Sequence, residues 1–301
     1  MSFEPILLSP EEAAEEIYPF RRVWRTSWIE ASLLVLAVVA ILLLSDPLGA
    51  LPSGLRDPLP KLGVALLPLG LWLAISYAAE RRALQPRPAL LGVLALGALV
   101  ANGIALPLEE RLFLPAQWLP EEGFFGRVLG YAATAGFVGE FLKYLVLRYT
   151  VWPGRIHQRL DGIAYALAAS VGYATVLNIR FALDADVTLT AMALRMASIT
   201  FSQVAVGLII GFFMAELAIG RTPIFWLPTG LLLGSLLSGL YYGFRGTAII
   251  SGLSVEGTAS APIRGLALAF GLLAVMYSAM AFIIESADTR TRLQTGRRDS
   301  L

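Results

Sequence analysis

The sequence predicts an all-α polytopic membrane protein with about eight membrane-spanning helices. Of its 301 residues, 57% are hydrophobic and only 15% are charged. The mean hydropathy of the chain is +0.70. A soluble domain of this length is far less apolar, and several apolar runs reach the ~20 residues that cross a bilayer. We therefore expect membrane lipids and helices of other membrane proteins as partners, and no nucleic acid.

The first 27 residues form a segment ahead of the first apolar run. Ser9, Pro10 and the two following glutamates give the order of N-cap, first-turn proline and first-turn acids that begins a helix. We expect a short amphipathic helix over about 10–18 on the cytoplasmic surface. The segment is acidic rather than basic, so it does not resemble a cleavable signal peptide.

A single transmembrane domain follows over residues 28–285. Its eight predicted spans are 28–45, 61–79, 89–107, 127–151, 161–183, 195–219, 222–244 and 262–285. The tail 286–301 carries four arginines without apolar periodicity, and we expect it to be disordered in the cytoplasm. Gly207 with Gly211, and Gly230 with Gly234, provide the GxxxG spacing that favours close helix packing.

Basic residues predict the orientation of these spans. Arginines gather before the first span, between the second and third, around 148–159, at 221 and in the tail. The positive-inside rule therefore puts both termini in the cytoplasm. We expect the cytoplasmic membrane of a bacterium, because arginine strongly outnumbers lysine. Of the outer connections, 108–126 and 245–261 are the longest, and we interpret the first as a solvated loop, with an interfacial hairpin as the alternative.

The stretch 136–181 holds polar side chains at membrane depth: Glu140 and Lys143 in one span and Asn178 in the next. A charge in the bilayer centre costs at least about 2.5–3.5 kcal/mol, so these groups should face the protein interior. Glu140 and Lys143 are three residues apart and share a helical face, so we predict an ion pair. These two residues can be interpreted structurally, as an ion pair between packed helices. They can also be interpreted functionally, with Glu140 as a catalytic carboxylate.

Few chemistries remain open at this depth. The chain has no cysteine and one histidine, His157, in the basic loop 155–159. Catalytic zinc normally has three His, Asp, Glu or Cys ligands, so we predict no metal and no other cofactor. A serine triad would need a histidine within the membrane. Glu30, Glu80 and Glu216 lie near span ends, where headgroup solvation explains them.

Between about 130 and 245 the chain resembles PrsW-type intramembrane proteases, a family related to the CAAX-type glutamate proteases. Gly139-Glu140-Phe141-Leu142-Lys143 is similar to the EExxK motif of that family. Asp161-Gly162-Ile163-Ala164-Tyr165 with Gly172-Tyr173-Ala174-Thr175-Val176-Leu177-Asn178 resembles its DGxxY…GFAxxEN segment. Arg195 and Gln203 match the positions of an arginine and a histidine, and Ser238 that of a second histidine.

The residues that differ from this pattern decide what the resemblance implies. Gly139 and Leu177 replace glutamates, while Gln203 and Ser238 replace histidines. These four positions lie on four helices, and three of them are roughly 24 Å from the cytoplasmic ends of their spans. We therefore expect one degenerate site, in which the retained residues are Glu140, Lys143, Asp161, Asn178 and Arg195. Asp161 also suits a helix N-terminus by itself.

We therefore expect a PrsW-like pseudoprotease that binds a membrane partner or serves as an accessory subunit. Small residues at Gly139, Ser202 and Ser238 would let a partner helix approach. The alternative is an active intramembrane endopeptidase with Glu140 as base. A transporter or channel is a weaker alternative, because only Glu140 and Lys143 would line its path.

Overall fold

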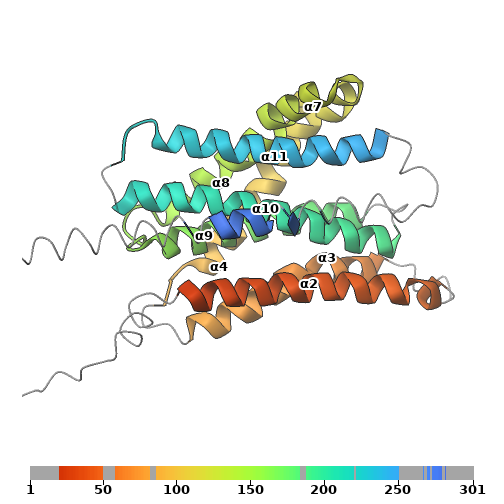
Figure 1. Ribbon diagram of the computed structural model, residues 1–301, viewed down its shortest axis with the longest axis horizontal. Coiled ribbons are helices and arrows are strands. Elements are labelled where there is room, and N and C mark those ends of the chain that lie inside the picture. Colours follow the sequence, from red (N-terminus) through yellow and green to blue (C-terminus); the bar gives the residue numbers. More distant parts are fainter. Residues whose placement is uncertain are drawn as a thin grey trace, which may run out of the picture.

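The computed structural model describes residues 20–49, 58–81, 86–183, 188–219 and 222–250, together with some positions between 267 and 282. Every regular element in these ranges is a helix, which confirms the predicted all-α class. The long helices lie side by side (Figure 1). They are α2 (Phe20–Gly49), α3 (Pro58–Glu80), α9 (Arg159–Ala182), α10 (Leu189–Ile219) and α11 (Trp226–Ile250), while the shorter α8 (Phe137–Thr150) belongs to one of two further rods.

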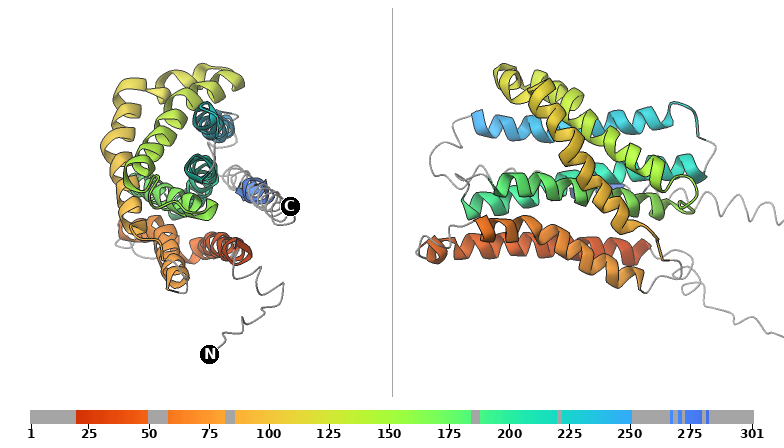
Figure 2. Two further views of the ribbon diagram at one scale, coloured as in Figure 1. Left: turned by 90° about the vertical axis from the view of Figure 1, so that its left-hand side faces the viewer. Right: turned by 180° about the vertical axis from the view of Figure 1, so that it is seen from behind.

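Two further rods are composite and contain π-helical turns. The first runs through α4 (Leu90–Val100), η2 (Ala101–Ala105), α5 (Leu106–Leu108) and η3 (Glu109–Phe113). The second leads through α7 (Phe124–Tyr131) and η5 (Ala132–Gly136) directly into α8. Both rods cross the other helices obliquely (Figure 2, right).

The predicted loop 108–126 is wrong over most of its length. The predicted span 89–107 continues as helix to Phe113. Two short turns follow, α6 (Pro115–Trp118) and the 3-10 turn η4 (Leu119–Glu121). Glu109, Glu110 and Glu121 therefore lie on helical backbone, and Glu109 is only partly exposed.

Among the described residues, four helices are long and apolar enough to cross a membrane. They are Leu59–Glu80, Leu90–Phe113, Arg159–Ala182 and Leu189–Ile219, and Trp28–Leu43 is a shorter apolar helix. They correspond to the predicted spans 61–79, 89–107, 161–183 and 195–219. A total of eight spans stays a prediction. The predicted helix 10–18, the tail 286–301 and the connection beyond residue 250 lie outside the described residues.

Helix α10 is the interior helix of the bundle. Seen along the helices, it is surrounded by the others (Figure 2, left), and most of its side chains between Met192 and Ala215 are buried. Glycines bring it close to α9: a Cβ on Gly211 would lie 2.7 Å from the Cα of Ile163. The Gly207/Gly211 spacing therefore serves packing within the chain.

Helix α9 is tied at its start to the connection between α3 and α4, and near its other end to the first composite rod. At the end where α9 begins, Arg87 bridges Asp161 at 2.8 Å and Glu80 at 2.9 Å. Near the other end, Arg180 approaches Glu110 at 3.3 Å. Between these points the helices nearly touch, because a Cβ on Gly172 would lie 2.0 Å from the carbonyl oxygen of Leu94. Helix α9 is thus held in a fixed register against α4.

Candidate functional site

Glu140 and Lys143 form an ion pair in the interior of the bundle. Both side chains project from α8, one helical turn apart, with the Nζ of Lys143 2.6 Å from the Oε1 of Glu140. Each residue is 1% exposed. A charge so far from water is tolerated only with a partner. The predicted pair is therefore present, and it is fully enclosed by protein.

The ammonium group of Lys143 also links α8 to two other helices. It donates to the Oε1 of Gln203 on α10 at 2.9 Å. It lies 5.5 Å from the centroid of the Tyr173 ring on α9, within the range of a cation–π interaction. We call Glu140, Lys143, Tyr173 and Gln203, together with Ser238, the Glu140 cluster.

Helix α11 closes the cluster from the side of the carboxylate. Ser238 faces Glu140 and is 3% exposed. A Cβ on Gly234 would lie 3.3 Å from the Cγ of Glu140, so α11 passes directly against this side chain. The second carboxylate oxygen, Oε2, is buried without a hydrogen-bond partner among the described residues.

Of the two positions predicted to have lost a glutamate, only Gly139 reaches the cluster. A Cβ on Gly139 would lie 3.2 Å from the hydroxyl of Tyr173. Leu177 instead packs against an apolar group that includes Val138 and Leu142 of α8. Gly139, Gln203 and Ser238 thus lie at the cluster, while Leu177 lies in the apolar group beside Tyr173; that these four positions form one degenerate site stays a prediction.

Asn178 and Arg195 lie beyond the cluster, toward the end where α9 stops and α10 starts. The amide of Asn178 donates to the hydroxyl of Thr200 at 3.3 Å. This hydrogen bond thus joins Asn178 to α10 and not to Glu140 of α8. The guanidinium of Arg195 stacks over the ring of Phe181 at 3.9 Å.

Asp161 is remote from the cluster and has the structural role expected from sequence. Its Oδ2 accepts hydrogen bonds from the backbone N–H groups of His157 and Gln158, which completes a capping box at the start of α9.

The predicted helix-binding groove is wrong. Gly139, Ser202 and Ser238 are buried against helices of the same chain, so they leave no open slot.

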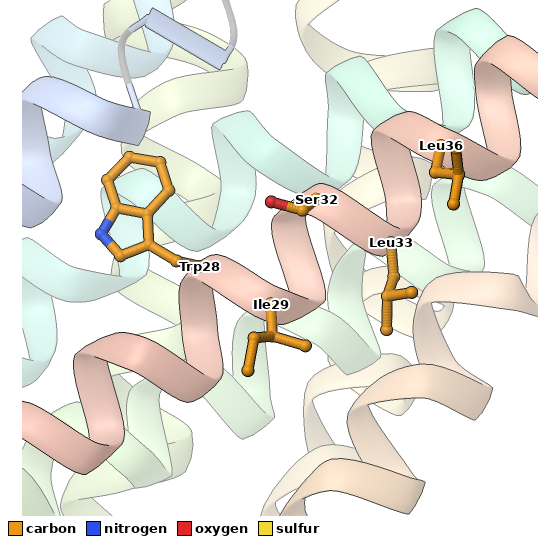
Figure 3. Close-up of a pocket in the computed structure, with 5 residues that line it drawn as sticks. All are labelled: Trp28, Ile29, Ser32, Leu33 and Leu36. Carbon is orange, nitrogen blue, oxygen red and sulfur yellow. The ribbon is translucent and has the colours of Figure 1, made fainter.

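The structure also shows a shallow groove of about 330 Å³ on α2, away from this cluster. It is lined by Trp28, Ile29, Ser32, Leu33 and Leu36 (Figure 3). All five residues come from one face of α2, and four of them are apolar. Because no residue of α8 to α11 lines it, the groove is not part of the Glu140 cluster.

Comparison with known proteins agrees with this architecture. Residues 85–255, more than half of the chain, match the family described as PrsW family intramembrane metalloprotease. The chain belongs to the PrsW family. A curated member, Protease PrsW of Bacillus subtilis (strain 168), is 31% identical over 112 residues, which are 36% of this chain and 50% of that protein. The chain thus spans about half the length of this relative. No solved structure matches the chain.

The PrsW family description implies a metal ion, and the residues present do not fit one. Catalytic zinc is held by three His, Asp, Glu or Cys side chains. Within the described ranges, no three such residues come together. The Glu140 cluster offers one carboxylate, and the ammonium of Lys143 already lies against it. Its other groups are an amide, a hydroxyl and a phenol, which are poor ligands for zinc.

Sequence reasoning missed two residues near this site. Tyr173 belongs to the family motif in the sequence, but its ring also lies against both Gly139 and Lys143. Thr200 carries no motif signal. It lies one turn from Gln203 on α10, and this i, i+3 spacing is the signal that could have found it.

Proposed function

We propose that this chain is a PrsW-family membrane protein without peptidase activity, which acts by binding a membrane partner or as an accessory subunit of a membrane complex. One observation carries the proposal. The only carboxylate in the Glu140 cluster is neutralised by the lysine on its own helix at 2.6 Å. The groups that would activate water are replaced by Gly139, Gln203 and Ser238.

The chemistry of hydrolysis explains why this matters. Peptide cleavage needs an activated water and donors that stabilise the oxyanion. Lys143 and Gln203 already hold each other at 2.9 Å, and the described part of the cluster contains no histidine. A fixed internal ion pair suits a structural role, in which Lys143 joins α8, α9 and α10.

Binding would then use the membrane-facing surface, since the cluster is enclosed. We further propose that both termini lie on the cytoplasmic side of a bacterial inner membrane, as the arginine distribution predicts. The transmembrane helix of another protein and the surrounding lipids are the partners we expect.

An active intramembrane endopeptidase is the second candidate, and two observations favour it. The chain retains Glu140, whose Oε2 has no hydrogen-bond partner in the described residues. It also matches a curated relative named a protease. In this reading Glu140 would act as the base once its pair with Lys143 loosens.

Reconstitution separates the two candidates. The purified protein is placed in liposomes with single-span membrane proteins, and both cleavage and cross-linking are measured. We expect cross-linking without cleavage. Cleavage that is lost in Glu140→Ala but kept in Glu216→Ala, with both variants folded, would overturn the proposal. Glu216 is a suitable control because it pairs with Arg159 far from the cluster.

A further inference from the structure

Buried polar side chains are unevenly distributed along the bundle. On one side of the Glu140 cluster, toward Arg159 at the start of α9, the interior is apolar beyond Ser170, whose buried hydroxyl has no hydrogen-bond partner among the described residues. Its packing is formed by buried side chains of α8, α9 and α10, among them Val146, Leu147, Ala166, Ile210 and Met214. Water entering from this end would have to cross a closely packed apolar layer.

On the other side, polar groups continue from the cluster to the end where α9 stops and α10 starts. Gln203, the partner of Lys143, lies one turn from Thr200 on the same face of α10. Thr200 accepts a hydrogen bond from Asn178 at 3.3 Å. We call Glu140, Lys143, Gln203, Thr200 and Asn178 the polar string. It reaches to within five residues of the last residue before the α9–α10 connection, Leu183.

Two acceptors on the polar string have no partner among the described residues. They are the Oε2 of Glu140 and the Oδ1 of Asn178, on residues that are 1% and 0% exposed. An unsatisfied buried acceptor costs about 1–3 kcal/mol. In native proteins, such atoms are usually satisfied by ordered water. The two acceptors lie at opposite ends of the string, so we expect ordered water beside each of them.

We propose that water enters the bundle at the α9–α10 end and reaches the Glu140 cluster along the polar string, while the Arg159 end stays closed. The string is therefore a one-sided hydrated path for water and for small ligands that donate hydrogen bonds to a carboxylate. This goes beyond the proposed function and is independent of it, since a hydrated path would serve a binding site and a peptidase alike.

The absence of cysteine makes the path directly measurable. Single cysteines are introduced into the full chain at Thr200, which belongs to the string, and at Ser238, which faces Glu140 at the inner end of the string. Two matched controls are equally buried: Ala205→Cys on an opposite face of α10, and Ala166→Cys in the apolar layer. Each variant is reconstituted in lipid nanodiscs and treated with a water-soluble methanethiosulfonate.

We expect Thr200→Cys and Ser238→Cys to react at least about tenfold faster than both controls, because only the hydrated thiolate attacks the reagent. Rates within about twofold of Ala205→Cys would overturn the proposal, as would fast reaction of Ala166→Cys. If Thr200→Cys does not fold, the modification rate of Ser238→Cys alone is compared with the rates of the two controls.

A blocking variant tests the route itself. Asn178→Leu removes the member of the polar string nearest the α9–α10 end, and in the Ser238→Cys background it should slow modification severalfold. Leu177→Ala, on the neighbouring apolar position, should not slow it. An unchanged rate in Asn178→Leu would show that water reaches Ser238 by another way, and the polar string would be rejected as the path.

Discussion

Removing Lys143 should destabilise the protein more than removing any surface charge. In Lys143→Met, Glu140 would remain buried without the cation now 2.6 Å away, and Gln203 would lose the donor at 2.9 Å. Breaking a buried ion pair on one side costs about 3–5 kcal/mol. We expect a loss of that size in the free energy of unfolding, measured by titration from mild micelles into dodecyl sulfate.

The double variant Glu140→Leu/Lys143→Met provides the decisive comparison. Replacing both members of a buried pair by apolar groups is often nearly neutral, so the double variant should be more stable than Lys143→Met alone. The chain's other lysine, Lys61, is the matched control. Because the side chain of Lys61 is partly exposed, Lys61→Met should cost about 1 kcal/mol or less. If the loss in free energy of unfolding in the double variant equals the sum of the losses in the two single variants, the buried ion pair would be refuted.

Three further predictions concern packing, metal content and orientation. Gly172→Ala should strongly lower the thermal unfolding temperature of the protein in detergent, because its Cβ would lie 2.0 Å from the Leu94 carbonyl oxygen. The control Gly92→Ala, whose Cβ would meet nothing within 4 Å, should leave that temperature almost unchanged. Elemental analysis of the purified protein should find no stoichiometric zinc, and zinc that persists in His157→Ala would contradict the donor argument. A topology reporter fused after Leu301 should be active only in the cytoplasm, and activity on the outer side alone would reverse the assignment.

The ion pair could be predicted from sequence because it depends only on local spacing. Two opposite charges three residues apart within an apolar run have to share a helical face, and neither can remain unpaired in lipid. The cap at Asp161 is local in the same way. Contacts across helices, such as Tyr173 against Gly139, depend on how α9 is rotated against α8, and apolar periodicity does not determine that rotation.

The helical course of 108–113 could not be predicted for a different reason. Pro107 lacks a backbone N–H and normally clashes with the carbonyl four residues earlier, so it favoured a helix end. Here the preceding turn widens, and the N–H of Leu106 bonds to Ala101, five residues back. The π-helical turn accommodates the proline, and the rod continues.

Helix α8 has a consequence for how the protein is made. Its rod from Phe124 to Thr150 carries Arg127, Glu140 and Lys143. In the described part of the chain, this rod is not among the four helices that are long and apolar enough to cross a membrane. Each central charge adds about 2.5–3.5 kcal/mol to the free energy of inserting this rod into the membrane as an isolated segment. Its partner Gln203 on α10 is synthesised sixty residues after Lys143. We therefore expect α8 to insert into the membrane only after α9 and α10 have been synthesised. A nascent chain arrested before residue 189 should then contain a poorly inserted α8.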